Sequence, residues 1–342
     1  MYEMAMQQIV GVFPSLDPFG GVQASGREAW QGIVNQIGEQ RACFIGYRPG
    51  ASKTLAALGA LATRGQGQVL LVWHLNLLKL APLAAGAEAR VVVFLHGIEA
   101  WRRQDALTRW VLGRVHLFLS NSDHTWERFA NSNPTFRGAP HETVHLGAGT
   151  NLESTPPAPS ARPAALMLGR MLRSEDYKGH RQLIETWPLV VERLPTAELW
   201  IAGDGDLRPR LEELARAVGL GSRVRFFGQI SEEQKQELIA QCHCLALPSS
   251  GEGFGLVYLE AMRIGRPCLV SDQDAGREVV NPPEAGLAAN PDDPQQLAEA
   301  TARLLRAGPE WDQWSQQARR RYESQFTAER FHDRLNAALF RN

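Results

Sequence analysis

The chain has 342 residues, more than one ordinary hydrophobic core supports, so two domains are expected. Its formal net charge of −1 provides no global basic field, which argues against a nucleic-acid-binding protein. Hydrophobic residues make up 44% of the chain, a share that excludes a disordered protein and is typical of a packed globular one.

Cysteine usage and the absence of export signals indicate the compartment. The four cysteines are Cys43, Cys242, Cys244 and Cys268. Their uneven spacing fits a reducing environment better than a disulfide framework. Residues 1–8 lack the basic start of a signal peptide, and polar residues interrupt the longest apolar stretch, residues 69–87. We therefore expect a cytoplasmic protein, and peripheral attachment to the inner face of the cell membrane stays open.

Short apolar runs alternate with helical patterns along the first half, which predicts an α/β domain with a parallel sheet. The expected strands cover residues 8–13, 41–47, 69–73, 90–95, 117–120 and 142–145. Gly20 and Gly21 follow the first strand and open a helical pattern. Such a turn brings backbone N–H groups to the end of the sheet, and a turn without a ligand is the alternative. His96 directly follows the fourth strand, so it should lie at a strand end where ligands bind.

A basic stretch in the first half combines arginines with tryptophans. It consists of Trp101, Arg102, Arg103, Arg109, Trp110 and Arg114. Helices that dock on anionic lipid have this composition. An ordinary exposed helix with two half-buried tryptophans has it as well, so both interpretations stay open.

Residues 151–163 are rich in proline and poor in bulky side chains, which predicts a linker. Beyond it the alternation restarts. The expected strands are residues 165–169, 198–202, 224–228 and 242–247, and the expected helices are residues 179–194, 207–218 and 232–240. Residues 310–340 are predicted to be helical. The whole pattern predicts two doubly wound domains that face each other across a cleft.

Residues 248–261 are the most informative stretch, because a buried strand leads there through a glycine-rich turn into a helix. Gly251, Gly253 and Gly255 let a ligand approach the backbone closely. The helix points its N-terminus at the same place and favours an anion there. Glu252 and Glu260 flank the junction. Two carboxylates beside an anion site suit a nucleotide sugar, which carries phosphates at one place and hydroxyls at two others.

The seven-residue spacing between Glu252 and Glu260 resembles the Glu-x(7)-Glu signature of retaining glycosyltransferases of family 4, which have the GT-B fold. The resemblance covers most of the chain, with further motifs in the family's order. They are Gly169-Arg170 with Tyr177-Lys178-Gly179-His180, Trp200-Ile201-Ala202-Gly203-Asp204-Gly205, and Phe227-Gly228-Gln229.

This resemblance implies the division of the chain. Residues 1–155 would form an acceptor-side Rossmann-like domain, and residues 156–325 would form a Rossmann-like domain that binds a nucleotide-sugar donor. A terminal helix, about residues 326–342, would cross back to the first domain. Where the first domain ends, Leu146-Gly147-Ala148-Gly149 departs from the family's usual turn.

The resemblance also implies roles for single residues. Arg170 and Lys178 would bind the donor's pyrophosphate, Glu260 the ribose hydroxyls, and Glu252 would lie by the transferred sugar, where His96 would donate or accept a hydrogen bond. The residues implied in catalysis are His96, Arg170, Lys178 and Glu252. The residues implied in donor binding are Gly20, Gly21, Arg170, Lys178, Ile230, Glu252, Gly253, Phe254, Gly255, Leu256 and Glu260.

The implied activity is a metal-independent transfer of a hexose from a UDP- or GDP-linked donor to a saccharide or lipid-linked acceptor, with retention and without a cofactor. A nucleotide-sugar epimerase or a glycoside phosphorylase of the same fold is the first alternative, and a two-lobed sugar-binding protein is the second. The Arg170, Lys178 and glutamate set disfavours the epimerase, the short chain disfavours a large phosphorylase, and the binding protein would need an export signal. Cys242 and Cys244 alternate as on one face of a strand, without a second pair at zinc-like spacing, so no metal site is predicted.

Overall fold

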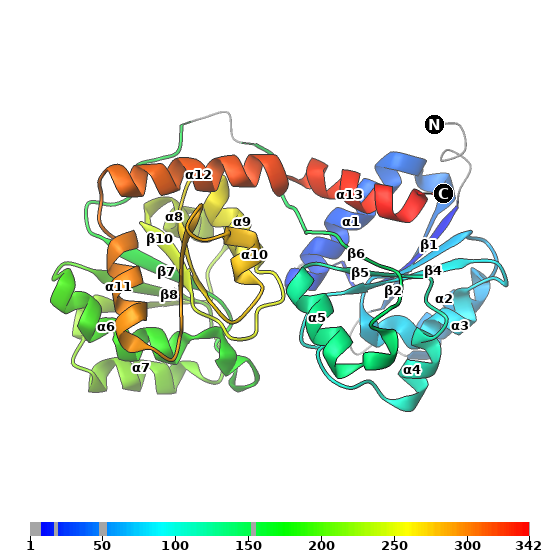
Figure 1. Ribbon diagram of the computed structural model, residues 1–342, viewed down its shortest axis with the longest axis horizontal. Coiled ribbons are helices and arrows are strands. Elements are labelled where there is room, and N and C mark those ends of the chain that lie inside the picture. Colours follow the sequence, from blue (N-terminus) through cyan, green and yellow to red (C-terminus); the bar gives the residue numbers. More distant parts are fainter. Residues whose placement is uncertain (1–7, 17–19, 48–52, 152–154, 342) are drawn as a thin grey trace. The chain divides into compact units, whose positions relative to one another are not determined.

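The structure is a computed structural model that describes residues 8–16, 20–47, 53–151 and 155–341 (Figure 1). The chain forms two compact units, one of Met1–Thr150 with Phe326–Asn342 and one of Asn151–Gln325. Within the described part of the chain, no helix combines the length and the apolar character that a membrane span requires.

The first unit is built on a six-stranded parallel sheet with the order β2-β1-β3-β4-β5-β6. Its strands are β1 (Ile9–Pro14), β2 (Ala42–Tyr47), β3 (Val69–Val72), β4 (Arg90–Leu95), β5 (Leu117–Ser120) and β6 (His141–Thr143). Its α-helices are α1 (Gly21–Ile37), α2 (Lys53–Ala62), α3 (Ala81–Ala84), α4 (Ala106–Leu112), α5 (Asp123–Ser132) and α13 (Ala328–Phe340). Short 3₁₀ helices cover Glu39–Arg41, Leu75–Leu80 and Pro134–Phe136.

Continuous apolar strands and an aromatic cluster form the core of this unit. The central strand β4 is almost entirely buried, as expected for a parallel sheet covered by helices on both faces. Trp73, which follows β3, stacks on Phe13 at a centroid distance of 5.4 Å and packs at a tilt against Phe94 at 4.3 Å. The last helix, α13, packs on α1, where the Asn336 amide donates to the Gly32 carbonyl at 3.3 Å. The C-terminal helix therefore completes the unit that the N-terminal residues begin.

The second unit is a six-stranded parallel sheet with the order β12-β11-β10-β7-β8-β9. Its strands are β7 (Ala164–Leu168), β8 (Glu198–Ala202), β9 (Val224–Gly228), β10 (Cys244–Leu247), β11 (Cys268–Ser271) and β12 (Gly286–Ala289). Its α-helices are α6 (His180–Arg193), α7 (Arg208–Ala217), α8 (Glu232–Gln241), α9 (Leu256–Arg263), α10 (Gly276–Val280), α11 (Pro294–Leu304) and α12 (Pro309–Gln325). Short 3₁₀ helices cover Arg173–Lys178 and Gly221–Arg223.

The fully buried Arg266 ties the start of the second unit to its core. Its guanidinium donates to the backbone carbonyls of Ile239 at 3.2 Å and of Pro157 at 2.5 Å. Its guanidinium carbon lies 5.8 Å from the centre of the Trp311 ring. The proline-rich segment after residue 154 therefore packs with the second unit.

The predicted start of one strand is wrong. Cys242 does not lie on a strand, because its N–H donates to the Leu238 carbonyl and closes α8, so that β10 begins only at Cys244. The predicted helical character of residues 310–340 is confirmed, and the segment forms two helices, α12 and α13, because the Thr327 side chain accepts from the Arg330 N–H and starts a new helix.

Candidate functional site

The predicted donor residues lie at the point where the strand order of the second sheet reverses. From β7 the chain continues to β8 and β9 on one side, and then to β10 on the other side of β7. The segments that follow β7 and β10 therefore leave the sheet side by side at its carboxyl edge, where doubly wound sheets bind ligands. The first carries Arg170 and Lys178, and the second carries Glu252 and Glu260.

The two segments are in direct contact. Lys178 Nζ lies 3.4 Å from Glu252 Oε2, and these side chains are only 15% and 20% exposed. The Ser250 N–H donates to the Tyr177 carbonyl at 2.9 Å. Gly179 has a φ of +87°, and a Cβ there would lie 2.4 Å from the Pro248 carbonyl oxygen. Only glycine allows this approach, so the Lys-Gly motif fixes Lys178 beside the glycine-rich turn.

Arg170 differs from Lys178 in its exposure and its partner. Its side chain is 60% exposed and forms an ion pair with Glu175, whose own side chain is 13% exposed. Oε2 of Glu175 is buried and has no hydrogen-bond partner among the described residues. The pair joins an exposed guanidinium to a mostly buried carboxylate, so an anion that drew Arg170 away would have to offset the lost partner of Glu175.

Glu260 projects from α9 toward α8. Its Oε1 accepts from Lys235 Nζ at 2.8 Å, whereas Oε2 is buried with no partner among the residues that the structure describes. Burial raises the pKa of this carboxyl, and the Lys235 charge opposes the rise. A carboxylate oxygen that is withheld from water needs a donor, which a ligand hydroxyl can supply.

The turn between Glu252 and α9 contributes backbone groups. Gly255 precedes the helix with a φ of +87°, and no described side chain caps the helix at that end. The first N–H groups of α9 are therefore available to an anion. Phe254 is buried, Leu256 is half-buried, and Ile230 is half-buried in the segment after β9.

The first unit places its predicted residues at the carboxyl edge of its own sheet. His96 Nε2 lies 2.6 Å from the Trp73 carbonyl oxygen, so Nε2 carries the proton and Nδ1 remains the acceptor. Burial, with the neighbouring His74, lowers the pKa of His96 to about 3, so the ring is neutral at physiological pH. Gly20 and Gly21 follow β1, which lies beside β3 at the reversal point of this sheet. Each unit therefore gathers its own candidates, and the structure does not relate the two sets to each other.

Residues 162–307 match the family described as Glycosyl transferases group 1. This part of the chain is a glycosyl transferases group 1 domain. It contains every second-unit residue named above, from Arg170 to Glu260.

Curated relatives of the group 1 domain are sugar-transferring enzymes. Phosphatidyl-myo-inositol mannosyltransferase of Mycobacterium leprae is 34% identical over 174 residues, which cover 48% of this chain and 45% of that protein. Alpha-D-kanosaminyltransferase of Streptomyces kanamyceticus is 33% identical over 144 residues, which cover 42% of this chain and 36% of that protein. The chain therefore spans less than half the length of these relatives.

Solved structures resemble the chain over both units. HepE from Anabaena, solved in complex with UDP and glucose, matches with a TM-score of 0.76 at 17% identity, over 97% of this chain and 99% of that chain. Sucrose-phosphate synthase from Thermosynechococcus elongatus matches with a TM-score of 0.76 at 18% identity, over 97% of this chain and 98% of that chain. Likeness at this identity shows the fold, and the predicted GT-B fold is confirmed.

Sequence reasoning missed several partners in the group 1 domain. Asp274 accepts from the Glu252 N–H at 2.9 Å, and Lys235 holds Glu260. Both ring nitrogens of His180 are buried and have no described partner, and burial lowers the pKa of this histidine to about 4. In the first unit, Glu99 accepts from the His96 N–H at 2.7 Å. The contacts of Asp274, Lys235 and Glu99 join residues far apart in the chain or follow no known spacing, so no motif pointed to them. His180 belongs to a recognised motif, but no role was predicted for it.

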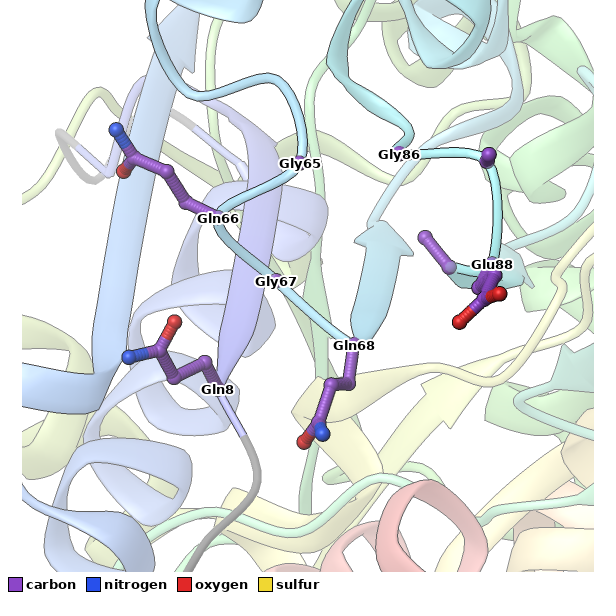
Figure 2. A pocket seen from close by; sticks show the side chains of 9 residues that line it. Gln8, Gly65, Gln66, Gly67, Gln68, Gly86 and Glu88 are labelled. Carbon is purple, nitrogen blue, oxygen red and sulfur yellow. The ribbon is translucent and has the colours of Figure 1, made fainter.

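A hollow in the first unit lies at the opposite edge of its sheet. Gln8 and Gln68 precede β1 and β3, and the lining also includes Gly65, Gln66, Gly67, Gly86, Ala87, Glu88 and Ala89. Figure 2 shows Gln66 and Gln68 extending in different directions from one short segment, so these side chains do not converge on a ligand. In the described ranges, no three His, Cys, Asp or Glu side chains gather as a metal site.

Proposed function

We propose that the chain is a retaining, metal-independent hexosyltransferase of glycan or glycolipid biosynthesis. It would transfer a hexose from a UDP- or GDP-linked donor to a saccharide or lipid-linked acceptor. One observation carries the proposal, namely the contact between Lys178 and Glu252 at the reversal point of the second sheet. A cation for a diphosphate and a carboxylate for a sugar meet there, beside the N-terminus of α9.

The donor's diphosphate would bind among fixed positive groups. Lys178 and the backbone N–H groups of α9 supply positive charge, and the exposed guanidinium of Arg170 would exchange Glu175 for a phosphate. Negative charge that grows on the leaving diphosphate would be stabilised by the same groups, which lowers the barrier to transfer. The departing phosphate oxygen would take the acceptor's proton, so no protein nucleophile is required.

The sugar and the ribose would contact the two glutamates and His96. The unpaired Oε2 of Glu260 would accept from the ribose hydroxyls, and Glu252 would contact the transferred hexose. His96 is neutral and would accept a hydrogen bond from that sugar through Nδ1. HepE was solved in complex with UDP, and curated relatives are named mannosyltransferases. Both findings support a nucleotide-sugar donor with either base.

Calorimetry with UDP and GDP tests the proposal directly. We expect tight binding of one nucleotide, because its diphosphate and its ribose each meet complementary groups. The isotherm should be unchanged in excess EDTA, since the cations of the site belong to the protein. Failure to bind either nucleotide would remove the support for a transferase, and loss of binding in EDTA would contradict metal independence.

We also propose that the protein is cytoplasmic and attaches to an anionic membrane through the surface around α4. Ile98, Leu107 and Trp110 are 47%, 54% and 52% exposed, and Leu107 and Trp110 share one face of α4 because they lie three positions apart. Arg114 lies 3.6 Å from the centre of the Trp110 ring, and exposed Arg102 and Arg103 precede the helix. Apolar side chains among arginines match a surface of acyl chains beneath anionic headgroups.

The variant Leu107→Ser, Trp110→Ser is expected to lose flotation with vesicles that contain anionic lipid. The reason is that both side chains leave water when the protein binds, whereas serine gains nothing there. The matched control is Leu61→Ser, since Leu61 is 46% exposed and belongs to a different helix, α2. The wild-type protein should float at low salt and less at high salt. If the wild type does not co-migrate with anionic vesicles at low salt, the membrane proposal is wrong.

A further inference from the structure

Asp274 and the residue that follows it hydrogen-bond to both backbone groups of Glu252 in the glycine-rich turn. Its Oδ2 accepts from the Glu252 N–H at 2.9 Å, and its Oδ1 accepts from the Gly276 N–H at 2.9 Å. The next N–H along the chain, that of Ala275, donates to the Glu252 carbonyl at 3.2 Å. Asp274 is only 3% exposed, so water does not compete for these bonds.

Among the described residues, no cation forms an ion pair with Asp274. Tyr258 on α9 lies against the same backbone, because a Cβ on Gly276 would be 3.0 Å from the Tyr258 hydroxyl. That hydroxyl donates to the Leu247 carbonyl. The Ser249 hydroxyl bonds to Asp274, Glu252 is the nearest other carboxylate, and Lys178 pairs with Glu252 instead. A carboxyl in this position costs stability, so its presence calls for a reason.

We propose that Asp274 is a positioning residue of the donor site, whose carboxylate fixes where Glu252 and the turn up to Gly255 meet the donor. This role rests on the proposed function. Asp274 does not touch the donor itself and acts through the backbone of Glu252. An ionised carboxylate only accepts hydrogen bonds, so it can hold several N–H and O–H donors at once. An amide in its place would turn its own NH₂ toward one of them.

The ionisation of Asp274 separates this role from a purely structural one. Burial, opposed by its N–H donors and assisted by the Glu252 charge, raises the pKa of Asp274 from 3.8 to about 7. In the unfolded chain the Asp274 carboxyl has a pKa near 3.8. The free energy of unfolding therefore falls as the pH rises from 3.8 to about 7, and it does not change further above pH 7. Asparagine carries no charge and avoids this loss. Ionisation of Asp274 should also strengthen its hydrogen bond to the Glu252 N–H, because the charged carboxylate can accept from all of its N–H and O–H donors at once.

Asp274→Asn should therefore change stability and transfer in opposite directions as the pH rises. At pH 5.5 the neutral carboxyl resembles the amide, so variant and wild type should have similar kcat/KM for the donor. At pH 8.5 the variant should be the more stable protein relative to wild type, yet its kcat/KM should be lower by roughly 10- to 100-fold, as expected for a displaced contact. A structural role would move both quantities together.

Two further measurements complete the test. Amide hydrogen exchange between Ser249 and Gly255 should accelerate in Asp274→Asn, and it should be unchanged in Glu198→Gln, which alters a buried carboxyl at the start of β8. In a Glu252→Ala background the backbone N–H at position 252 remains, but the carboxylate that it positions is gone, so Asp274→Asn should reduce kcat/KM less. Exchange at wild-type rates, or an undiminished effect without Glu252, would overturn the proposal.

Failure of the proposed function would be recognised separately. It would appear as a wild-type protein that binds neither UDP nor GDP, and the exchange measurement on the turn would still decide whether Asp274 holds Glu252.

Discussion

Replacing Lys178 by alanine is expected to weaken nucleoside diphosphate binding by at least about 30-fold, the equivalent of ~2 kcal/mol. Two effects act together. The variant removes the least exposed cation of the site, and it leaves the Glu252 carboxylate, which is 20% exposed, without its partner and facing the diphosphate. The loss should appear with inorganic pyrophosphate as well, because Lys178 acts on charge and not on the nucleoside. Calorimetry with UDP, GDP and pyrophosphate measures it.

Arg173→Ala is the matched control for Lys178→Ala. Arg173 belongs to the same 3₁₀ helix, its side chain is 78% exposed, and its Nε lies 3.7 Å from Oδ2 of Asp206. Loss of an exposed cation only weakens long-range attraction, which salt screens. We expect this control to bind nearly as tightly as wild type at physiological salt. Equal losses in the two variants would mean that general positive charge, and not a site at Lys178, attracts the nucleotide.

The sequence predicted the parts of the fold whose signals are local. Buried parallel strands are continuous apolar runs, so strands such as β4 and β8 were placed at their observed bounds. Strand β12, Gly286–Ala289, is a short Gly-Leu-Ala-Ala segment without β-branched residues, and it was not recognised. The helical character of residues 310–340 was recognised from the sequence, and the break between α12 and α13 depends on one threonine cap within this pattern.

The glycines of the motifs show why a linear pattern can carry three-dimensional information. A Cβ on Gly203, where φ is +135°, would lie 1.9 Å from the Gly169 carbonyl oxygen. Gly179 approaches the Pro248 carbonyl in the same way. Both motifs therefore keep glycine where neighbouring strand ends must touch, and the touching segments carry Lys178 and Glu252. These motifs could be recognised in the sequence because only glycine permits the close backbone contacts at Gly179 and Gly203.

The partners of the site residues had no such signal. Asp274 reaches Glu252 over 22 positions and Lys235 reaches Glu260 over 25 positions. Aspartate and lysine are common on surfaces, so nothing in their local sequence distinguishes them from solvated residues. Burial is what makes them informative, and burial follows from packing. The assignment of ligands to Glu252, Glu260 and His96 remains a prediction that binding experiments must test.

Replacing Glu260 by alanine is expected to separate recognition of the nucleoside from recognition of the phosphates. Affinity for UDP or GDP should fall roughly 10- to 100-fold, which corresponds to hydrogen bonds between hydroxyls and a charged acceptor. Affinity for inorganic pyrophosphate should not change, because Glu260 faces Lys235 on α8 and not Lys178. This pattern differs from the one expected for Lys178→Ala, which should weaken binding of both the nucleotide and pyrophosphate.

Glu232→Ala is the control, since Glu232 is 62% exposed and is the other carboxylate that pairs with Lys235, at 2.9 Å. Lys235 keeps one carboxylate partner in each variant, so any difference between them comes from Glu260 itself. Its buried Oε2, which has no partner among the described residues, is the atom that a ribose would satisfy. If Glu260→Ala bound UDP and GDP as tightly as Glu232→Ala does, the buried oxygen would have no role in nucleoside binding. A loss confined to the nucleotides would assign it that role, because pyrophosphate lacks only the nucleoside.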